Sequence, residues 1–226
     1  MSLTLAFDIY GTLIDTSGVF TKLSDMIGEP AAAVMKTWRQ KQLEYSFRRG
    51  LMRRHTDFSV CTRDALIFSC ETHNIHLSKK KINELLHEYT ILPAFQDVRE
   101  CLESCRNQDH KMYAFSNGSK SAVRQLLEHS GTLTLFDGIV STEDVKTFKP
   151  SPDVYHHFTK TVGSQPSDTW LISGNSFDVT GARACGWKAV WVQRKDDNIF
   201  DPWEEKELEP TVTLQRLSEL PNILSE

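Results

Sequence analysis

The sequence predicts an α/β protein in which a parallel sheet is covered by helices on both faces and carries an inserted all-helical domain. Short apolar segments alternate with helical patterns from about residue 93 to the end of the chain. Between the first apolar segment, residues 3–7, and that alternation, residues 16–92 show helical patterns and no convincing strand. Strands joined through helices make right-handed crossovers, so the alternating part predicts a parallel sheet.

The strands of the sheet and the helices that cover it are expected in the alternating part. Residues 3–7 are mostly apolar and uncharged, as expected for a first strand that is buried on both faces. We predict further strands at residues 111–115, 138–141, 170–172 and 188–192, and helices at 98–107, 120–130, 152–162, 178–185 and 214–224. Gly131 follows one of these helices, as a stop residue would. Residues 196–210 are polar and acidic, which predicts a surface loop.

The inserted block predicts four helices, at residues 19–27, 31–49, 57–74 and 79–89. Pro30 suits the first turn of the second helix, and Ser78 is placed to cap the start of the fourth. We therefore expect a core made of residues 1–15 and 93–226 and a helical cap made of residues 16–92. The cap would follow the carboxyl end of the first strand, where it could close over a site and exclude water.

Composition excludes several classes of partner. The chain has 226 residues, of which 39% are hydrophobic and 25% charged, as in an ordinary globular protein. Its net charge of −4 argues against general nucleic-acid binding, which needs a basic surface. No apolar run approaches the ~20 residues that span a bilayer, and the first residues lack the pattern of a secretory signal. We therefore expect a cytoplasmic protein without nucleic-acid or membrane partners.

Cysteines and histidines indicate neither a disulfide framework nor a metal site. The five cysteines are scattered along the chain, an odd number that is typical of reduced thiols. His73, His76, His156 and His157 lack a companion cluster of ligands, so we interpret them as surface or packing residues.

Asp8 directly follows the first predicted strand, and Gly11 marks a turn just after it. In open α/β sheets the carboxyl ends of the strands form the edge at which ligands bind. A carboxylate at that edge can act as a covalent nucleophile, which replaces one difficult displacement by two easier ones. An Asp after a strand can equally well only cap a turn, and the later motifs decide between these interpretations.

Two further loops follow predicted elements of the same sheet. Ser116 and Asn117 come after the second strand, where they could cap the next helix or form an anion cradle with free backbone N–H groups. Lys149 is followed by two prolines within three residues, which stiffen its loop and favour a positioned ammonium over a solvated one. An ammonium close to Asp8 would keep that carboxylate ionised.

Arg39 interrupts an apolar stripe in the second predicted helix of the cap. Its neighbours one turn away are Met35 and Leu43, and Phe47 continues the stripe. Such an arginine could snorkel over the cap surface, or it could be a partly buried cation that points at the site.

Five segments resemble motifs of the haloacid dehalogenase superfamily, and the cap segment among them resembles that of the L-2-haloacid dehalogenases. These segments are residues 8–13, 38–45, 116–117, 148–155 and 173–178. Tyr10 and Gly174 stand where the magnesium-dependent phosphatases of the superfamily carry Asp, so the resemblance implies no metal and no cofactor. It further implies a three-layer, Rossmann-like core with a parallel sheet and an inserted helical cap domain.

The resemblance implies a hydrolase that converts (S)-2-haloacids to (R)-2-hydroxyacids through an ester on Asp8. The catalytic residues that it implies are Asp8, Thr12, Arg39, Ser116, Lys149, Tyr155, Ser173, Asn175 and Asp178. The substrate-binding residues that it implies are Tyr10, Arg39, Leu43, Phe58, Ser116, Asn117 and Phe177. The expected partners are a small halogenated carboxylic acid, water, the released halide and a second copy of the chain in a homodimer.

The resemblance also assigns tasks to these side chains. Ser116 would hold the substrate carboxylate, and Arg39 and Asn117 would stabilise the departing halide. An apolar pocket would be walled by Leu43, Phe58 and Phe177. Lys149 and Thr12 would orient Asp8, and Tyr155 would orient Lys149 or its surroundings. Water would be positioned by Asn175, Asp178 and Ser173. Two other functions remain open: a magnesium-dependent phosphatase of the same superfamily, and a non-catalytic binding protein with this fold.

Overall fold

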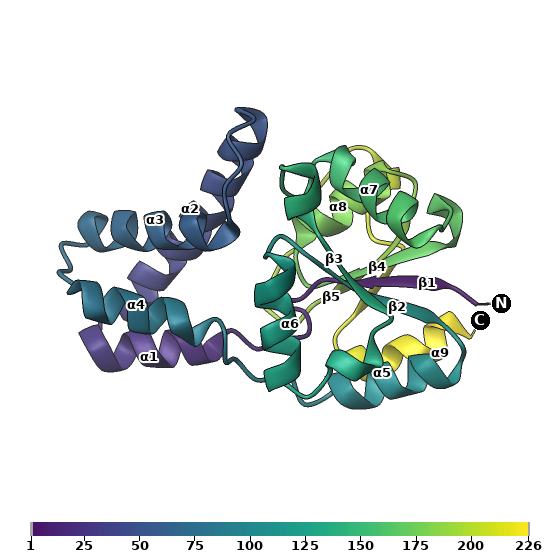
Figure 1. Cartoon of the computed structure of the whole chain (residues 1–226), viewed down its shortest axis with the longest axis horizontal. Helices are drawn as coiled ribbons and strands as arrows, with labels where there is room; N and C mark the ends of the chain where they lie inside the picture. Colours follow the sequence, from purple (N-terminus) through teal and green to yellow (C-terminus); the bar gives the residue numbers. More distant parts are fainter. Residues whose placement is uncertain (1, 226) are drawn as a thin grey trace.

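The computed structural model describes residues 2–225 and shows a six-stranded parallel sheet flanked by helices (Figure 1). The strands lie in the order β3-β2-β1-β4-β5-β6, and every neighbouring pair is parallel. Their bounds are Thr4–Phe7 (β1), Lys111–Ser116 (β2), Gly138–Ser141 (β3), Thr169–Ser173 (β4), Lys188–Val192 (β5) and Val212–Leu214 (β6). The apolar first strand therefore lies inside the sheet, between β2 and β4.

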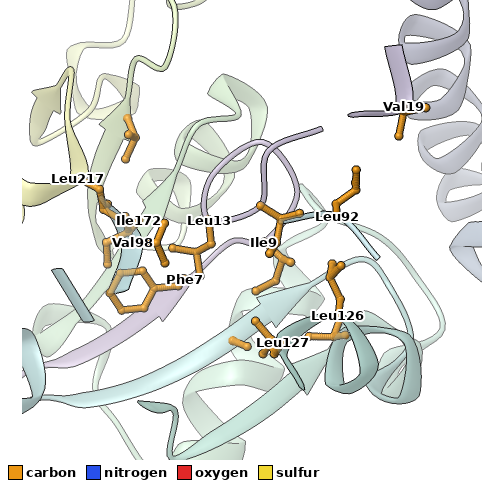
Figure 2. Close-up of a cluster of buried hydrophobic side chains, with 14 of the residues drawn as sticks. Phe7, Ile9, Leu13, Val19, Leu92, Val98, Leu126, Leu127, Ile172 and Leu217 are labelled. Carbon is orange, nitrogen blue, oxygen red and sulfur yellow. The ribbon is translucent and has the colours of Figure 1, made fainter. Parts of the chain in front are cut away.

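Helices cover both faces of the sheet, so the core has three layers. These helices are Val98–Asn107 (α5), Lys120–His129 (α6), Pro152–Val162 (α7), Ser176–Ala184 (α8) and Leu220–Leu224 (α9). Side chains of β1 alternate between the two faces: Phe7 packs with α5 and α6 in one apolar cluster, and Ala6 packs with α7 and α8 in the other. Figure 2 shows the first cluster, in which Phe7 lies close to Val98 and Leu13. The predicted three-layer arrangement is confirmed.

Four helices follow β1 and form a separate body beside the sheet (Figure 1). They are Ser17–Ile27 (α1), Ala31–Leu51 (α2), Phe58–Thr72 (α3) and Lys79–Glu88 (α4). The side chain of Ser78 accepts a hydrogen bond from the backbone of Lys81 and caps α4, as predicted. Asp57 caps α3 in the same way, and Trp38 of α2 donates to the Thr62 carbonyl of α3 at 2.8 Å.

The two chain segments that link the helical body to the sheet run side by side. The backbone N–H of Phe95 donates to the carbonyl of Leu13, and that of Asp15 donates to the carbonyl of Pro93, both at 2.9 Å. Ile14 and Ala94 form an antiparallel bridge between them. The linker that returns from the helical body is therefore bound to the chain segment just after the turn that follows β1.

The predicted helix at residues 214–224 is wrong over its first half. The chain there forms β6, a short 3₁₀ turn at Leu217–Glu219, and only then helix α9. Strand β6 has only three residues, too few to show the alternation of apolar and polar residues that marks a strand in the sequence. It forms because it pairs with β5, and that pairing is a tertiary contact. Helix α8 begins two residues before its predicted start. Among the described residues, no helix is long and apolar enough to cross a membrane.

Candidate active site

Asp8 lies at the carboxyl end of β1, between the ends of β2 and β4. The parallel register places Phe7 opposite Ala114 on one side and Ile172 on the other, so the three strands end at one edge. Gly11 adopts a left-handed conformation with φ of 77°, which allows the chain to turn there. Asp8 is only 7% exposed, so its carboxylate depends on protein donors for most of its solvation.

The two oxygens of the Asp8 carboxylate have different surroundings. Oδ2 accepts hydrogen bonds from Thr12 Oγ1 at 2.7 Å and Asn175 Nδ2 at 2.8 Å, with Ser173 Oγ at 3.4 Å. Oδ1 accepts from Lys149 Nζ at 3.2 Å, its one donor among the described residues. Oδ2 is therefore held in place, while Oδ1 is the oxygen that keeps lone pairs free for a reaction.

Lys149 is a buried cation shared by two carboxylates. Its ammonium is 2.7 Å from Asp178 Oδ2 and 3.2 Å from Asp8 Oδ1, and it also donates to the Phe115 carbonyl at 2.8 Å. The side chain is 1% exposed. The Asn117 side chain accepts from the Lys149 backbone N–H at 2.9 Å, which fixes the lysine loop against the end of β2.

Asp178 lies in the first turn of α8 and is itself fully buried. Burial raises the pKa of its carboxyl, the Lys149 ammonium and the Tyr155 hydroxyl oppose this effect and Asp8 adds to it, and the resulting pKa is about 6. Tyr155 donates to Asp178 Oδ1 at 2.8 Å. The tyrosine therefore contacts Asp178 rather than Lys149, so it orients the lysine only through the shared carboxylate.

Ser116 and Ser173 end the two strands that flank β1. Ser116 Oγ accepts from the backbone N–H of Gly118 at 3.0 Å, and Ser173 Oγ accepts from that of Asn175 at 3.1 Å. Each hydroxyl therefore braces its own turn. Both side chains are buried, at 1% and 0% exposure.

Gly174 leaves no room for a larger residue. A Cβ atom at this position would lie 2.6 Å from the carbonyl oxygen of Gly11, a contact that requires the backbone to shift. A carboxylate cannot be accommodated here as the chain stands, and Tyr10 is no ligand for a hard cation. Among residues 2–225 no group of three or more His, Cys, Asp or Glu side chains is placed to hold a metal ion. The donors present do not suit Mg²⁺.

Arg39 reaches from α2 of the helical body to the sheet edge. Its Nη2 donates to Asn175 Oδ1 at 2.9 Å, and its Nη1 donates to Gln42 Oε1 at 2.7 Å. Burial lowers the pKa of the guanidinium, and Tyr89 and Asp8 oppose this effect. Arg39 is thus the partly buried cation that points at the site. Gln42, which donates to Thr62 Oγ1 at 2.8 Å, was missed, although it stands three residues after Arg39 and so lies beside it on the helix.

A cavity of about 700 Å³ lies between the helical body and the sheet edge. Its lining includes Tyr10, Gly11, Phe20, Met35, Arg39, Gln42, Asp57, Phe58, Leu86, Tyr89, Gly118, Ser119, Gly174, Asn175 and Arg194. Phe58, expected in the apolar wall, and Tyr10, expected to bind substrate, thus both line the cavity. Leu43 and Phe177 do not belong to the lining that the described residues form, and Phe177 instead packs edge-on against Phe47 at 5.3 Å. The roles of Leu43 and Phe177 in the wall therefore stay predictions, and Tyr89, which does line the cavity, was missed.

Comparison with known proteins agrees with this architecture. Residues 5–192 match the family model described as haloacid dehalogenase-like hydrolase. The chain therefore belongs to the haloacid dehalogenase-like hydrolase family.

Individual relatives are similar over nearly the whole chain. An (S)-2-haloacid dehalogenase 2 of Pseudomonas sp. (strain CBS-3) is 34% identical over 98% of this chain and 95% of its own. An (S)-2-haloacid dehalogenase of Pseudomonas sp. (strain YL) is 32% identical over 93% of each chain. The structure of L-2-haloacid dehalogenase from Xanthobacter autotrophicus with chloropropionic acid covalently bound is 28% identical, with a TM-score of 0.88, over 100% of this chain and 99% of that one.

Proposed function

We propose that this chain is a hydrolase acting on carbon–halogen bonds, which converts (S)-2-haloacids to (R)-2-hydroxyacids through an ester on Asp8 and without a metal. The observation that carries the proposal is the placement of Asp8. One carboxylate oxygen is bound by three donors and the other by a buried ammonium, and the cap cation Arg39 contacts the same Asn175 that holds the carboxylate. The relatives named above act on the same class of substrate by their names.

In the first step, Asp8 Oδ1 attacks C2 of the haloacid from the side opposite the halogen. The new C–O bond forms as the carbon–halogen bond breaks, the halide leaves with the bonding electrons, and the configuration inverts. Ser116 and the N–H groups of its turn hold the substrate carboxylate. Arg39 stabilises the charge that develops on the halogen, assisted by the Asn117 amide, whose Oδ1 is already bound to the Lys149 backbone.

In the second step, water attacks the carbonyl carbon of the Asp8 ester. Asn175 and Asp178, with Ser173, position that water, and Asp178 takes one of its protons. The bond between the acyl carbon and the alkyl oxygen breaks and the hydroxyacid oxygen receives that proton. The second proton of the water is released to solvent, which restores the Asp8 carboxylate. A carboxylate whose pKa is about 6 suits this task near neutral pH.

Several finer statements belong to the same proposal. The catalytic core comprises residues 1–15 and 93–226, and residues 16–92 form the cap. Among the described residues, the bridge between Ile14 and Ala94 supports a boundary at the paired linkers. The protein works in the cytoplasm and as a homodimer, and the released halide and the attacking water are its other partners.

Halide release from L- and D-2-chloropropionate in EDTA tests the proposal. Chloride and the R hydroxyacid should appear with the L isomer only. An aryl phosphate assay with Mg²⁺ runs beside it. Phosphate release under Mg²⁺ without chloride release would establish the phosphatase instead, and inactivity in both assays would favour a binding protein.

A further inference from the structure

Arg194 follows β5 and connects parts of the chain that lie far apart in the sequence. Its Nε and Nη2 donate to the carbonyl oxygen of Thr12 at 3.1 and 2.7 Å. Its Nη1 donates to both carboxylate oxygens of Asp97, at 2.9 and 2.7 Å. The guanidinium also lies over the ring of Phe95, 4.1 Å from its centre. One planar cation therefore holds three groups in a fixed relation.

The groups that Arg194 holds are the turn after Asp8 and the end of the return linker from the cap. Thr12 donates its hydroxyl to Asp8, so its position sets that of the carboxylate. The backbone N–H of Phe95 donates to the carbonyl of Leu13, in the linker that leads into the cap. Asp97 stands at the N-cap of α5 and accepts from the Leu217 N–H at 2.7 Å. The linker that returns from the cap is thus fixed to the sheet on one side and to the turn after Asp8 on the other.

Burial makes this connection stiff. The side chains of Arg194 and Asp97 are 12% and 19% exposed, and Thr12 is fully buried. Breaking the ion pair would leave a poorly solvated carboxylate, so the pair is expected to stay formed. An attack in line with a bond depends on the nucleophile's position, and a displacement of about 1 Å can cost a hundredfold in rate.

We propose that Arg194 is a positioning residue that couples the cap linker to the placement of Asp8 through Thr12. This inference rests on the proposed function, because it assumes that Asp8 is the nucleophile. It explains how the position of the cap is linked to the position of that nucleophile. Arg194 lines the cavity but acts on the reaction through the main chain of Thr12 rather than by touching the halogen. Its loss should change the rate of ester formation more than it changes substrate binding.

The kinetic test compares Arg194→Ala with Arg183→Ala. Arg183 is the matched control, since it also donates to backbone carbonyl oxygens, those of Glu207 and Trp187. Neither of these residues belongs to the turn after Asp8. Arg194→Ala should lower halide release in a single turnover about tenfold to a hundredfold, with KM changed less than threefold. Added methylguanidinium should restore part of that rate, and Arg183→Ala should stay within twofold of the wild type.

A second readout is independent of turnover. Hydrogen exchange measured by mass spectrometry should become faster in residues 9–15 and 93–99 of Arg194→Ala and stay unchanged there in Arg183→Ala. Unchanged exchange in Arg194→Ala overturns the coupling, whereas absent halide release in the wild type overturns only the proposed function. Arg194→Lys covers a failure of the Ala variant to fold, because lysine reaches Thr12 or Asp97 but not both. Wild-type rates in Arg194→Lys would also overturn the proposal.

Discussion

The core side and the cap side of the site are built on different principles. On the core side, Asp8, Lys149 and Asp178 are at most 7% exposed and are joined by hydrogen bonds of 2.7 to 3.2 Å. On the cap side, aromatic rings dominate: Tyr89 lies edge-on to Tyr10 at 6.1 Å and to Trp38 at 5.7 Å. Arg39 forms a direct hydrogen bond between the two sides, at 2.9 Å to Asn175 of the core.

This difference indicates a division of work between the two sides. A charged network that is fully bonded before substrate arrives needs no reorganisation during the reaction, which is the main source of electrostatic catalysis. Apolar contacts are less directional and can shape a cavity without fixing the reacting atoms. Changes on the core side should therefore affect both chemistry and stability, and changes on the cap side should affect chemistry with little loss of stability.

Asp8→Asn should have the largest effect. The amide keeps the size of the side chain but cannot form the ester, so turnover should fall roughly 10⁴-fold or more. Halide release measures this directly. Asp57→Asn is the control, since Asp57 lines the same cavity and asparagine can still cap α3. Appreciable halide release by Asp8→Asn would refute covalent attack by Asp8.

Lys149→Met should impair both the reaction and the fold. Removing the ammonium leaves Asp8 and Asp178 buried without their shared cation, a change that costs about 3–5 kcal/mol in the free energy of unfolding. Urea unfolding of the variant and the wild type measures the difference. A variant as stable as the wild type would show that the core network contributes no net stability. The expected difference in stability effects between core-side and cap-side changes would then be refuted.

Much of the core side could be predicted from the sequence, because its side chains follow strand ends. Asp8 directly follows β1, and Ser116 and Ser173 end β2 and β4. Parallel register brings such strand ends together whatever the side chains are. The position of Lys149 was also predictable from its stiff loop. Its contact with Asp8 was expected, but its shorter bond to Asp178 was not, since Asp178 lies in a different turn, 29 residues away.

The cap side was harder to predict, because cavity walls depend on how helices lie across the sheet. Leu43 and Phe177 have the expected apolar character, yet Phe177 packs against Phe47 and neither lines the cavity among the described residues. Tyr89 reaches the cavity from the end of α4, a place that helical periodicity does not reveal. Strand β6 escaped prediction for a similar reason, since its pairing with β5 is a tertiary contact.

Arg39→Ala should separate chemistry from stability. Loss of the cation should slow ester formation by about 10²–10³-fold, the usual effect of removing one donor aimed at developing charge. Unfolding free energy should change by only about 1 kcal/mol, because the side chain contributes two hydrogen bonds and lines a cavity. Arg39→Lys is the companion variant, since lysine keeps the charge but cannot bond Gln42 and Asn175 together. A wild-type rate of halide release by Arg39→Ala would exclude the leaving-group role.

Tyr155→Phe should have the smallest effect on rate and the clearest effect on pH dependence. The Tyr155 hydroxyl stabilises ionised Asp178 and so lowers the carboxyl pKa, which burial holds at about 6. Removing that hydroxyl should raise the pKa. If water attack needs ionised Asp178, ester hydrolysis rises with pH through this pKa, and its acid limb should move to higher pH in the variant.

Single-turnover hydrolysis of the ester between pH 5 and 9, a range of about one unit below and three above that pKa, measures the position of this acid limb. The rate above it should fall less than about tenfold, because the remaining bond from Lys149 still orients the carboxylate. Tyr113→Phe is the control: Tyr113 of β2 packs edge-on against Phe158 in the same apolar cluster as Tyr155, and among the described residues its hydroxyl forms no hydrogen bond with Asp178. An acid limb that stays in place in Tyr155→Phe, or that moves equally in Tyr113→Phe, would remove Asp178 from the water-activating step and leave it a purely structural partner of Lys149.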